Sequence, residues 1–370
     1  MKDKDRILVV CTTDSMIWNF LIPHIKNLQK AGYRVECACS ITGSFFDDLQ
    51  KIHGLVMHRI CFSRSPYSLT NIKAYYQLNR IVQERRINLI FCHEPVGGAM
   101  GRLVGHRTKC RVIYMAHGFH FYKGAPKSAH IYYLVEKYLS KYTDALITIN
   151  REDYAASQTF FAKANYLLPG IGVDISKFIS HPDSTYLRKE LSIGNDETIL
   201  LSVGELIPRK NHISVIEAMK RMENPKIHYV IAGEGELEIE LKEKVAAWAL
   251  ENIHFLGYRT DVNKLCNAAD IFVMPSLQEG LSVALMEAMA CGLPIIASRI
   301  RGNIDLIDNG KGGLLVDAMD SLKYMEAIEK LIRSPEQYKQ MGEYNMNKIK
   351  KYSIENVEEQ LMPIIRAVDA

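Results

Sequence analysis

The chain has 370 residues, of which 48% are hydrophobic and 24% are charged. This balance is typical of a globular protein and excludes disordered, collagen-like and coiled-coil proteins. No apolar run approaches the ~18 residues that a membrane-spanning helix needs, and the apolar stretch after the charged N-terminus is too short for a signal peptide. We therefore expect a cytoplasmic protein of about two domains.

Charge is distributed unevenly along the chain. Residues 1–174 carry 23 Lys and Arg against 13 Asp and Glu, a net +10, whereas residues 175–370 carry 23 against 29, a net −6. A basic half beside an acidic half indicates that the first half faces an anionic partner. For any one of these cations a solvated helix face is the better interpretation. The summed asymmetry favours an anionic membrane surface as the partner, with a basic cluster between Arg102 and Arg111 among the contacts, and we expect no nucleic acid.

Neither the cysteines nor the charged N-terminus predicts a metal site. None of the eight cysteines forms a Cys-x-x-Cys pair and most lie in apolar segments, so buried free thiols in a reducing compartment are expected. Asp3-Lys4-Asp5 has Asp-x-Asp spacing, but it lies in a charged tail before the first strand. We therefore expect no metal ion and no other cofactor.

Taken in chain order, apolar β-rich runs alternate with stretches of helical period in the first half. The predicted strands are 6–11, 35–39, 56–62, 88–92, 112–116, 145–149 and 166–168. Predicted helices between them are 18–30, 71–84 and 128–141. Strands that alternate with helices indicate a parallel, doubly wound sheet, and continuous apolar strands agree because both faces of such a sheet are covered.

The second half repeats the pattern. Its predicted strands are 199–203, 228–232, 253–256, 271–275, 295–298 and 313–316. Its predicted helices are 212–221, 237–249, 281–290, 322–333 and 335–350, and a last helical stretch covers 353–368. The sequence therefore predicts an α/β fold with two Rossmann-like, doubly wound parallel-sheet domains.

The glycines and the proline of residues 169–174 suit a hinge between the halves. We expect an N-terminal domain over 1–174, a C-terminal domain over 175–352 and a closing helical segment over 353–370. The two halves are weakly similar in sequence, because Asp144 and Asp270 each precede an apolar strand within similar residues. Two such domains facing each other across a cleft would place a ligand at the carboxyl ends of their strands.

The segment with the most chemical information runs from Pro275 to Pro294. A predicted strand ends there, a glycine-bearing loop follows, and a helix begins near Leu281, so Gly280 and the next residues would offer free N–H groups to a phosphate. Glu279 and Glu287 lie eight residues apart, at most ~12 Å along a helix. That separation is long for a hydrolytic pair, but it suits two carboxylates on opposite ends of a sugar nucleotide.

Each glutamate also has a structural interpretation. For Glu279 taken alone, a solvated charge on the surface is about as plausible as a role in a binding site. It is a poor explanation for Glu287, because that residue is flanked by Met286 and Ala288, and a carboxylate in an apolar helix usually has a partner.

A second candidate segment follows the first strand of the second half. Gly204 allows close approach of a ligand to the backbone, while adjacent Arg209 and Lys210 supply positive charge suited to phosphate oxygens. A basic surface loop is the better interpretation of this segment alone. In combination with the predicted helix N-terminus at Gly280, a diphosphate site is favoured.

Two further segments follow strands of the first half. His117 stands where a strand ends and could donate to a sugar hydroxyl, although a lone histidine is more often structural, and His120 could be the structural one. His93 and Glu94 could line the acceptor side of a cleft, and a helix start packed through small residues is equally plausible there. Gly233-Glu234-Gly235 begins like a dinucleotide fingerprint, but no third glycine follows at the required position.

With these residues in view, the chain resembles the retaining family 4 glycosyltransferases, whose GT-B fold contains two Rossmann-like domains. The most specific motif is Glu-x7-Glu, here Glu279 and Glu287, followed by residues 288–294. The chain is similar in particular to the EpsD-like capsular and exopolysaccharide glycosyltransferases. That closer resemblance rests on residues 12–15, 93–98, 117–126, 147–154 and 298–303.

The resemblance implies roles for the catalytic candidates. Arg209 and Lys210 would bind the donor diphosphate and stabilise the leaving group. Glu279 would hold hydroxyls of the donor sugar, and Glu287 would hold the ribose. His117 would contact the donor sugar near the reacting carbon.

It also implies a wider set of binding residues. The donor side would be completed by Gly204, Gly280, Leu281 and Tyr258. Tyr258 would lie beside the backbone groups that recognise the nucleotide base. The acceptor side would consist of Asp14, Ser15, His93 and Glu94. Many relatives have a glycine-rich loop after the first strand, whereas this chain has Thr12-Thr13-Asp14-Ser15-Met16, so the role of that loop is open.

The resemblance thus implies a retaining, metal-independent glycosyltransferase, which we expect at the inner face of the membrane. It would move a sugar from a nucleotide diphosphate, UDP in the first instance, to a lipid-linked glycan in capsular or exopolysaccharide biosynthesis. Two alternatives stay open, a GT-B-fold epimerase acting on a UDP-sugar and a non-catalytic subunit that binds a sugar nucleotide or a glycan. A product assay separates them, because an epimerase needs no acceptor and a binding subunit releases no UDP.

Overall fold

The computed structural model describes residues 6–43, 45–178 and 185–370. The chain divides into two compact units. Unit 1 consists of Met1–Gly172 together with Ile354–Ala370, and unit 2 consists of Val173–Ser353. Asp3-Lys4-Asp5 lies outside the described residues.

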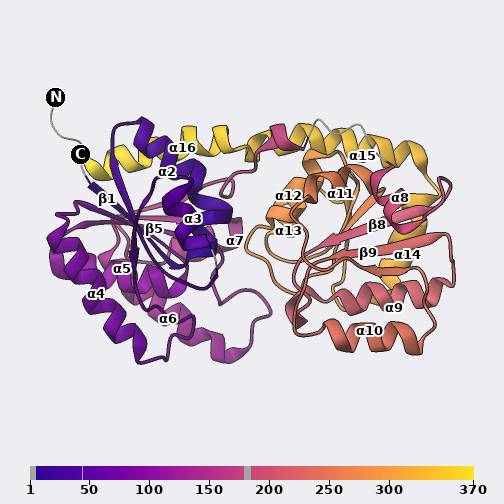
Figure 1. The fold of residues 1–370 in the computed structure, drawn as a ribbon, viewed down its shortest axis with the longest axis horizontal. Helices are drawn as coiled ribbons and strands as arrows, with labels where there is room; N and C mark the ends of the chain where they lie inside the picture. The colour runs from indigo at the N-terminus through magenta and orange to yellow at the C-terminus, as the bar shows by residue number, and fades with distance from the viewer. Residues whose placement is uncertain (1–5, 44, 179–184) are drawn as a thin grey trace. The chain divides into compact units, whose positions relative to one another are not determined.

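Unit 1 contains a parallel sheet of seven strands in the order β3-β2-β1-β4-β5-β6-β7. Its strands are β1 Arg6–Thr13, β2 Arg34–Ser40, β3 Val56–Arg59, β4 Leu89–His93, β5 Arg111–Ala116, β6 Ala145–Thr148 and β7 Ala164–Leu167. Its main helices are α2 Ile22–Lys30, α3 Phe45–Lys51, α4 Thr70–Glu84, α5 Pro95–Thr108, α6 His130–Leu139, α7 Arg151–Ser157 and α16 Ile354–Asp369. Helices α4, α5 and α6 cover one face of the sheet, and α2, α3 and α16 cover the other (Figure 1).

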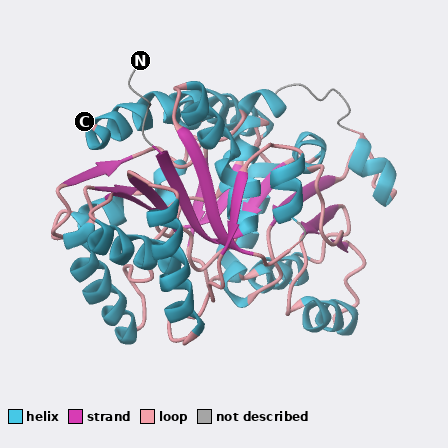
Figure 2. Cartoon of the chain, turned by 60° about the vertical axis from the view of Figure 1, so that its left-hand side comes forward, coloured by secondary structure: helices cyan, strands magenta, loops and turns pink. Residues whose placement is uncertain are grey.

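Unit 2 contains a parallel sheet of six strands in the order β10-β9-β8-β11-β12-β13. Its strands are β8 Thr198–Val203, β9 Ile227–Ala232, β10 Ile253–Phe255, β11 Ile271–Met274, β12 Ile295–Ser298 and β13 Gly313–Val316. Its main helices are α8 Tyr186–Leu191, α9 His212–Met222, α10 Glu238–Ala247, α11 Val262–Ala268, α12 Val283–Ala290, α13 Asn303–Leu306, α14 Ser321–Ile332 and α15 Pro335–Lys348. Helices lie on both faces of each sheet (Figure 2), which confirms the predicted doubly wound parallel architecture.

The first strand does not end in a loop. β1 runs to Thr13, and a short helix α1, Asp14–Met16, follows at once and continues through a π-helical turn at Ile17–Leu21 into α2. The residues that stand in place of a glycine-rich loop therefore begin a helix directly at the edge of the sheet.

Helix α5 is the longest element that the helical periodicity did not reveal. Its first half is rich in glycine, which is unfavourable in an isolated helix. A Cβ at Gly98 would lie 2.3 Å from the Tyr114 ring, and one at Gly105 would lie 2.2 Å from the Val112 side chain. The glycines therefore serve close packing of α5 on the sheet, which outweighs their low helix propensity.

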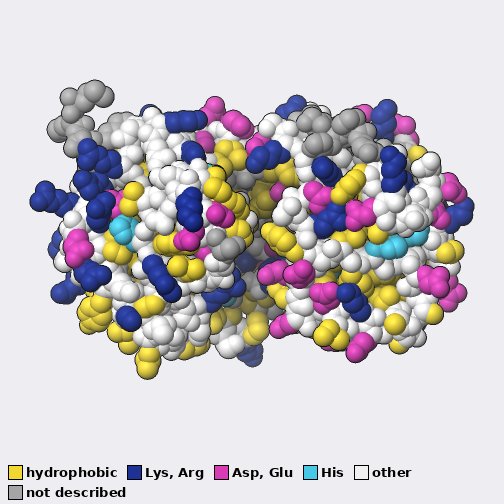
Figure 3. Space-filling view, viewed as in Figure 1, with side chains coloured by type: hydrophobic (Ala, Val, Ile, Leu, Met, Phe, Trp, Pro, Cys, Tyr) yellow, Lys and Arg dark blue, Asp and Glu magenta, His cyan; other side chains and the backbone are white. Residues whose placement is uncertain are grey.

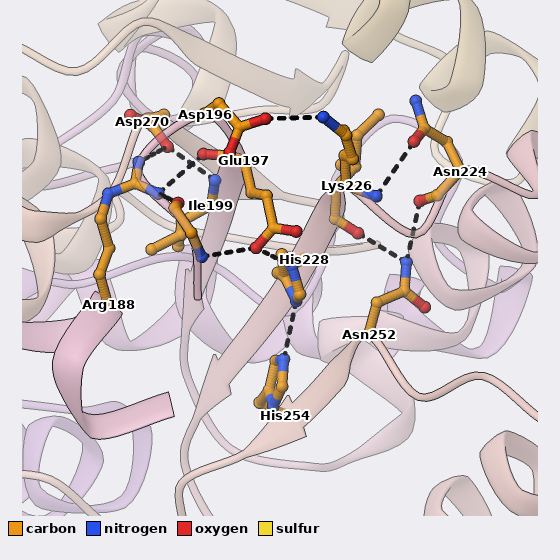
Figure 4. Close-up of polar contacts among 12 residues, drawn as sticks. Arg188, Asp196, Glu197, Ile199, Asn224, Lys226, His228, Asn252, His254 and Asp270 are labelled. Carbon is orange, nitrogen blue, oxygen red and sulfur yellow. Dashed lines mark hydrogen bonds and ion pairs between the residues drawn. The ribbon is translucent and has the colours of Figure 1, made fainter. Parts of the chain in front are cut away.

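Polar side chains close the amino edge of each sheet. Asp270 Oδ2 accepts from Ile199 N at 2.7 Å and pairs with Arg188 at 2.7 Å, in the network of Figure 4. In unit 1, Asp144 Oδ2 accepts from Val112 N, also at 2.7 Å. The sequence similarity around Asp144 and Asp270 thus marks an aspartate that accepts from the N–H of the second residue of the neighbouring strand.

Helix α16 packs against α2 within unit 1. Glu358 of α16 accepts hydrogen bonds from the His24 ring and from the Asn27 side-chain amide. The other ring nitrogen of His24, Nε2, lies 2.8 Å from the carbonyl oxygen of Ile171. These buried contacts attach the last helix to unit 1.

Candidate functional site

The loop after β8 places two cations at the carboxyl edge of the unit 2 sheet. A Cβ on Gly204, whose φ is +159°, would meet the Lys210 side chain at 3.2 Å, so the glycine leaves room for that side chain. Asn211 is buried and fixes the loop, because its side-chain amide donates to the carbonyls of Pro275 at 3.1 Å and Ala318 at 2.7 Å. The sequence pattern did not single out Asn211, whose role depends on carbonyls far away in the chain.

Both cations reach Glu279. Lys210 Nζ lies 2.8 Å from Glu279 Oε1, and Arg209 approaches the same oxygen at 3.4 Å while also donating to the Gln278 carbonyl at 3.1 Å. Burial acts to raise the pKa of Glu279, but the charges of Lys210 and Arg209 outweigh it and hold the pKa below the ordinary value. The structure thus brings together three residues that the sequence placed in two separate segments.

The predicted phosphate site at the start of α12 is only partly as expected. The helix begins at Val283 rather than Leu281, because the Ser282 side chain caps it by accepting from Leu285 N. Gly280 lies against Gly302, where a Cβ would be 2.4 Å from the Gly280 carbonyl oxygen. Leu281 is buried. The prediction of N–H groups open to a ligand therefore applies to the turn before Ser282.

Two residues that support this turn were not assigned a site role from the sequence. Arg301 is buried and its Nε donates to the Glu279 carbonyl at 3.1 Å. Gly302 has φ +81°, which a residue with a side chain adopts only under strain. Both hold the backbone that carries Glu279 and Gly280.

Glu287 lies one and a half turns into α12 and is partly buried. Its carboxylate has no hydrogen-bond or ion-pair partner among the described residues. Burial raises the pKa of Glu287 to about 7, although Lys177 works in the opposite direction. An unpartnered carboxylate in this position is available to accept hydrogen bonds from a ligand.

Glycines line the carboxyl ends of three adjacent strands in unit 2. Gly233 N donates to the Gly257 carbonyl at 2.8 Å, and a Cβ on Gly233 would lie 1.9 Å from the Gly204 carbonyl oxygen. Tyr258 follows with an exposed ring, and its backbone N–H donates to Glu234 at 3.2 Å. Gly233 is therefore needed for packing beside the site, although it is not part of a dinucleotide fingerprint.

A second polar cluster lies at the carboxyl edge of the unit 1 sheet. The Glu94 carboxylate accepts from the backbone N–H groups of Thr12 at 2.8 Å and Thr13 at 3.3 Å. Burial raises the pKa of Glu94, against the effect of those two N–H groups and of the Arg64 charge. Glu94 has φ +60°, an uncommon value for a residue other than glycine.

Asp14 and Ser15 of the predicted acceptor side lie beside this cluster. Asp14 is fully buried, and its Oδ1 accepts from the Thr42 hydroxyl at 2.7 Å and the Thr42 N–H at 3.1 Å. Asp14 Oδ2 has no hydrogen-bond partner in the part of the chain that the structure describes. Ser15 Oγ lies 3.0 Å from the Thr13 hydroxyl, so three polar side chains, those of Thr13, Asp14 and Ser15, lie together at the start of α1.

His93 and His117 form a neutral pair at the same edge. His93 Nδ1 lies 3.0 Å from His117 Nε2. Burial lowers the pKa of His93 well below the ordinary value and lowers that of His117 to about 3. His93 Nε2 is buried without a hydrogen-bond partner in the described ranges. Two neutral rings that share one proton can present one N–H to a hydroxyl.

We predicted that the cations between Arg102 and Arg111 form a basic surface cluster, and this prediction is wrong for Arg102. Arg102 is fully buried, and its guanidinium pairs with Glu136 at 2.7 Å and lies over the Tyr114 ring. Arg111 donates to the Asp369 carbonyl of the C-terminal helix. An arginine that pairs internally contributes no charge to a surface, and sequence alone does not distinguish it from an exposed one.

All eight cysteines are free, and five of them are buried. Within the ranges that the structure describes, no three His, Cys, Asp or Glu side chains are grouped as a metal site requires. The same ranges contain no helix of sufficient length and apolarity to cross a membrane.

The chain matches two family models. Residues 183–348 match the model described as Glycosyl transferases group 1, and residues 6–150 match the model described as Glycosyl transferase 4-like. Among curated relatives, EpsD of Bacillus subtilis (strain 168) is 33% identical over 98% of this chain and 96% of that protein. An Escherichia coli UDP-Gal:alpha-D-GlcNAc-diphosphoundecaprenol alpha-1,3-galactosyltransferase is 27% identical over 81% of this chain and 80% of the enzyme.

Solved structures show the same fold. HepE of Anabaena in complex with UDP-glucose has a TM-score of 0.83 at 18% identity, over 98% of this chain and 100% of that one. WaaG, a glycosyltransferase involved in lipopolysaccharide biosynthesis, has a TM-score of 0.74 at 17% identity, over 97% and 99%. With its two matched family models and its two parallel-sheet α/β units, the chain belongs to the group 1 glycosyltransferases of GT-B fold.

Proposed function

We propose that the protein transfers a sugar from a UDP-sugar to a lipid-linked saccharide, with retention of the anomeric configuration and without a metal ion. The observation that carries the proposal is the arrangement of Lys210 and Arg209 around Glu279 at the carboxyl edge of the unit 2 sheet. Two fixed cations at a strand edge suit a diphosphate, and an adjacent carboxylate suits sugar hydroxyls.

The donor would be held at both ends by the two glutamates. Glu279 would release part of its contact with Lys210 and accept hydrogen bonds from the donor sugar. Glu287, which has no partner among the described residues, would accept from the ribose hydroxyls. The exposed ring of Tyr258 would lie beside the base, and Gly204 and Gly280 would leave the backbone open to the phosphates.

Catalysis would come from stabilising the departing diphosphate. Negative charge grows on the leaving phosphate as the bond to the sugar breaks, and Lys210 and Arg209 would neutralise that charge. His117, neutral beside His93, would donate to the sugar near the reacting carbon. In this proposal the anomeric configuration is retained because the acceptor hydroxyl attacks the same face of the sugar from which the diphosphate leaves.

Two relatives support the choice of donor and acceptor. HepE has been solved with UDP and with UDP-glucose, and the Escherichia coli relative is named for transfer from UDP-Gal to a diphosphoundecaprenol-linked sugar. We extend both chemistries to this chain and place its product in capsular or exopolysaccharide assembly. The acceptor would be held at the polar cluster of Asp14, Ser15, His93 and Glu94, and the protein would work as a peripheral protein at the inner face of the membrane.

The test is transfer from a panel of UDP-sugars to undecaprenyl-diphosphate-linked sugars, measured by mass spectrometry of the lipid product and by UDP release. NMR of the product gives the anomeric configuration, and a parallel reaction with EDTA tests the metal requirement. Lys210→Ala should lower the rate of transfer, whereas Lys339→Ala, which replaces an exposed lysine of α15, should not. Sugar conversion without an acceptor would show an epimerase instead, and UDP binding without any product would show a binding subunit.

A further inference from the structure

Helix α6 has its acidic residue inside and several of its apolar residues outside. Glu136 is buried against Arg102, whereas Ile131, Leu134 and Tyr138 point away from the sheet with about half of each side chain exposed. An ordinary surface helix has the opposite polarity, with its apolar stripe toward the core. The outward stripe is therefore not explained by packing within unit 1.

A second exposed apolar segment adjoins α6. It consists of Tyr67 and Leu69 before α4 and of Ile72 and Tyr76 on α4, each between 57% and 80% exposed. The Tyr67 hydroxyl is hydrogen-bonded to that of Tyr132 on α6, and both helices pack on α5. Figure 3 shows hydrophobic side chains gathered over α4 and α6 at the lower left.

These apolar side chains are concentrated rather than scattered. Of the twenty large hydrophobic side chains exposed in the described residues, nine belong to this surface. We name them the α4–α6 surface. Its apolar members are Tyr67, Leu69, Ile72, Tyr76, Ile131, Leu134, Val135, Tyr138 and Phe161.

The same surface is strongly basic. Residues 64–80 and 120–142 contain seven Lys and Arg against a single acid, Glu136, which Arg102 already neutralises. Lys137 and Lys141 lie over the Phe161 ring at 5.5 and 5.1 Å, so charge and apolar area alternate at short range. The other cations are Arg64, Lys73, Lys123 and Lys127, together with Arg80, which pairs with Glu84 at 3.8 Å.

We propose that the α4–α6 surface is the face on which the protein binds an anionic lipid membrane. The proposal deepens the proposed function and rests on it, because a lipid-linked acceptor has to be reached at such a membrane. Exposed aromatic and aliphatic side chains enter the interface between headgroups and acyl chains, and lysines beside them meet anionic headgroups. A symmetric dimer through this face would oppose lysine to lysine, so the charge favours lipid over a second copy.

The surface is also continuous with the predicted acceptor side. Arg64, at one end of the segment before α4, acts electrostatically on Glu94, which in turn binds the N–H groups of Thr12 and Thr13. A membrane bound to the α4–α6 surface would therefore lie next to the polar cluster at the carboxyl edge of unit 1. A lipid diphosphate could pass from one to the other without leaving the interface.

Vesicle co-sedimentation of the full chain tests the proposal. Wild type should bind vesicles that contain phosphatidylglycerol, bind poorly to pure phosphatidylcholine, and release as salt rises from 0.1 to 1 M. Neutralising two charges by Lys127→Gln with Lys141→Gln should weaken binding by about 30-fold, since each charge contributes about fivefold. The matched control, Lys311→Gln with Lys339→Gln, removes the same charge from exposed positions of unit 2 and should bind like wild type.

The apolar part is tested by Leu134→Ser with Tyr138→Ser, which should weaken binding by more than about tenfold. Ile239→Ser, at a position of α10 that is 72% exposed, is its control and should bind like wild type. Equal binding by both surface variants and wild type, or equal binding to neutral and anionic vesicles, overturns the proposal. A dimer that forms without lipid and is lost in the Leu134→Ser and Tyr138→Ser variant also overturns it, because the occupant is then a second copy.

UDP calorimetry separates this proposal from the proposed function. The surface variants should bind UDP with wild-type affinity, because none of the replaced residues lies in unit 2. A wild-type protein that binds UDP-sugar and transfers it but binds no anionic vesicles would refute the docking surface and leave the proposed transferase activity intact. A wild-type protein that binds anionic vesicles but no UDP would support the docking surface and refute the proposed transferase activity.

Discussion

Glu287→Gln should stabilise the free protein above neutral pH and weaken its binding of UDP. The pKa of Glu287 rises from 4.5 to about 7 on folding because the carboxylate is desolvated without a partner. Between those two pH values the folded state holds a proton that the unfolded state has released, so stability falls as the pH rises through this window. Since one pKa unit corresponds to 1.36 kcal/mol, the full cost above pH 7 is about 3 kcal/mol at most.

Glutamine keeps the shape of the side chain and cannot ionise. Glu287→Gln should therefore match wild type near pH 4 and exceed its stability at pH 8 by up to about 3 kcal/mol. Urea unfolding measures this, and a Trp18→Phe background leaves Trp248 of unit 2 as the only tryptophan reporter. Glu243→Gln, an exposed glutamate of α10, is the control and should show no such pH dependence.

UDP affinity should change in the opposite direction. An ionised Glu287 would accept from the ribose hydroxyls, and a hydrogen bond to a charged group contributes about 1.5–3 kcal/mol. Wild-type affinity should rise with pH through 7, while Glu287→Gln binds more weakly and with a flat profile. Stability curves that stay parallel from pH 4 to 8 would refute the desolvation argument, and equal UDP affinity would refute the ribose assignment.

Four further outcomes follow from the structure. Lys210→Ala should lower turnover more than UDP affinity, because leaving-group charge grows in the transition state; steady-state kinetics with calorimetry decide, and unchanged turnover contradicts the assignment. Glu279→Ala should relax discrimination between donor sugars in a competition assay while UDP still binds, and loss of UDP instead would reverse the donor orientation. Gly204→Ala should lower the melting temperature and reduce transfer, because alanine is strained at this positive φ and its Cβ would crowd the Lys210 side chain at 3.2 Å; wild-type kinetics would show the approach to be unimportant. Arg102→Ala should destabilise unit 1 by about 3–5 kcal/mol in urea unfolding, since Glu136 would remain buried without its partner, and an effect below about 1 kcal/mol would contradict this.

Local patterns were sufficient to predict the architecture. Alternation of apolar β-rich runs with helical-period stretches indicated doubly wound parallel sheets, because such strands are buried on both faces and show no polar alternation. Parallel strands share a carboxyl edge, so polar residues that follow neighbouring strands could be expected to gather there. The Glu-x7-Glu spacing and the Arg-Lys pair were readable for the same reason, since each is contained in one short segment.

Contacts between distant segments were decided only by the tertiary structure. The bond from Lys210 to Glu279 joins residues 69 positions apart, and the support from Asn211 depends on carbonyls of two other strand ends. The sequence also counted Arg102 as surface charge, although it is buried against Glu136.

The same pairing decides the orientation of α6. A helix whose apolar residues are interrupted by a glutamate and a lysine has no preferred face until the glutamate pairs with a buried cation. Arg102 on α5 supplies that cation and turns the apolar stripe outward. Side-chain burial is a property of the packed chain, because the cost of burying a charge depends on which partner the fold brings to it.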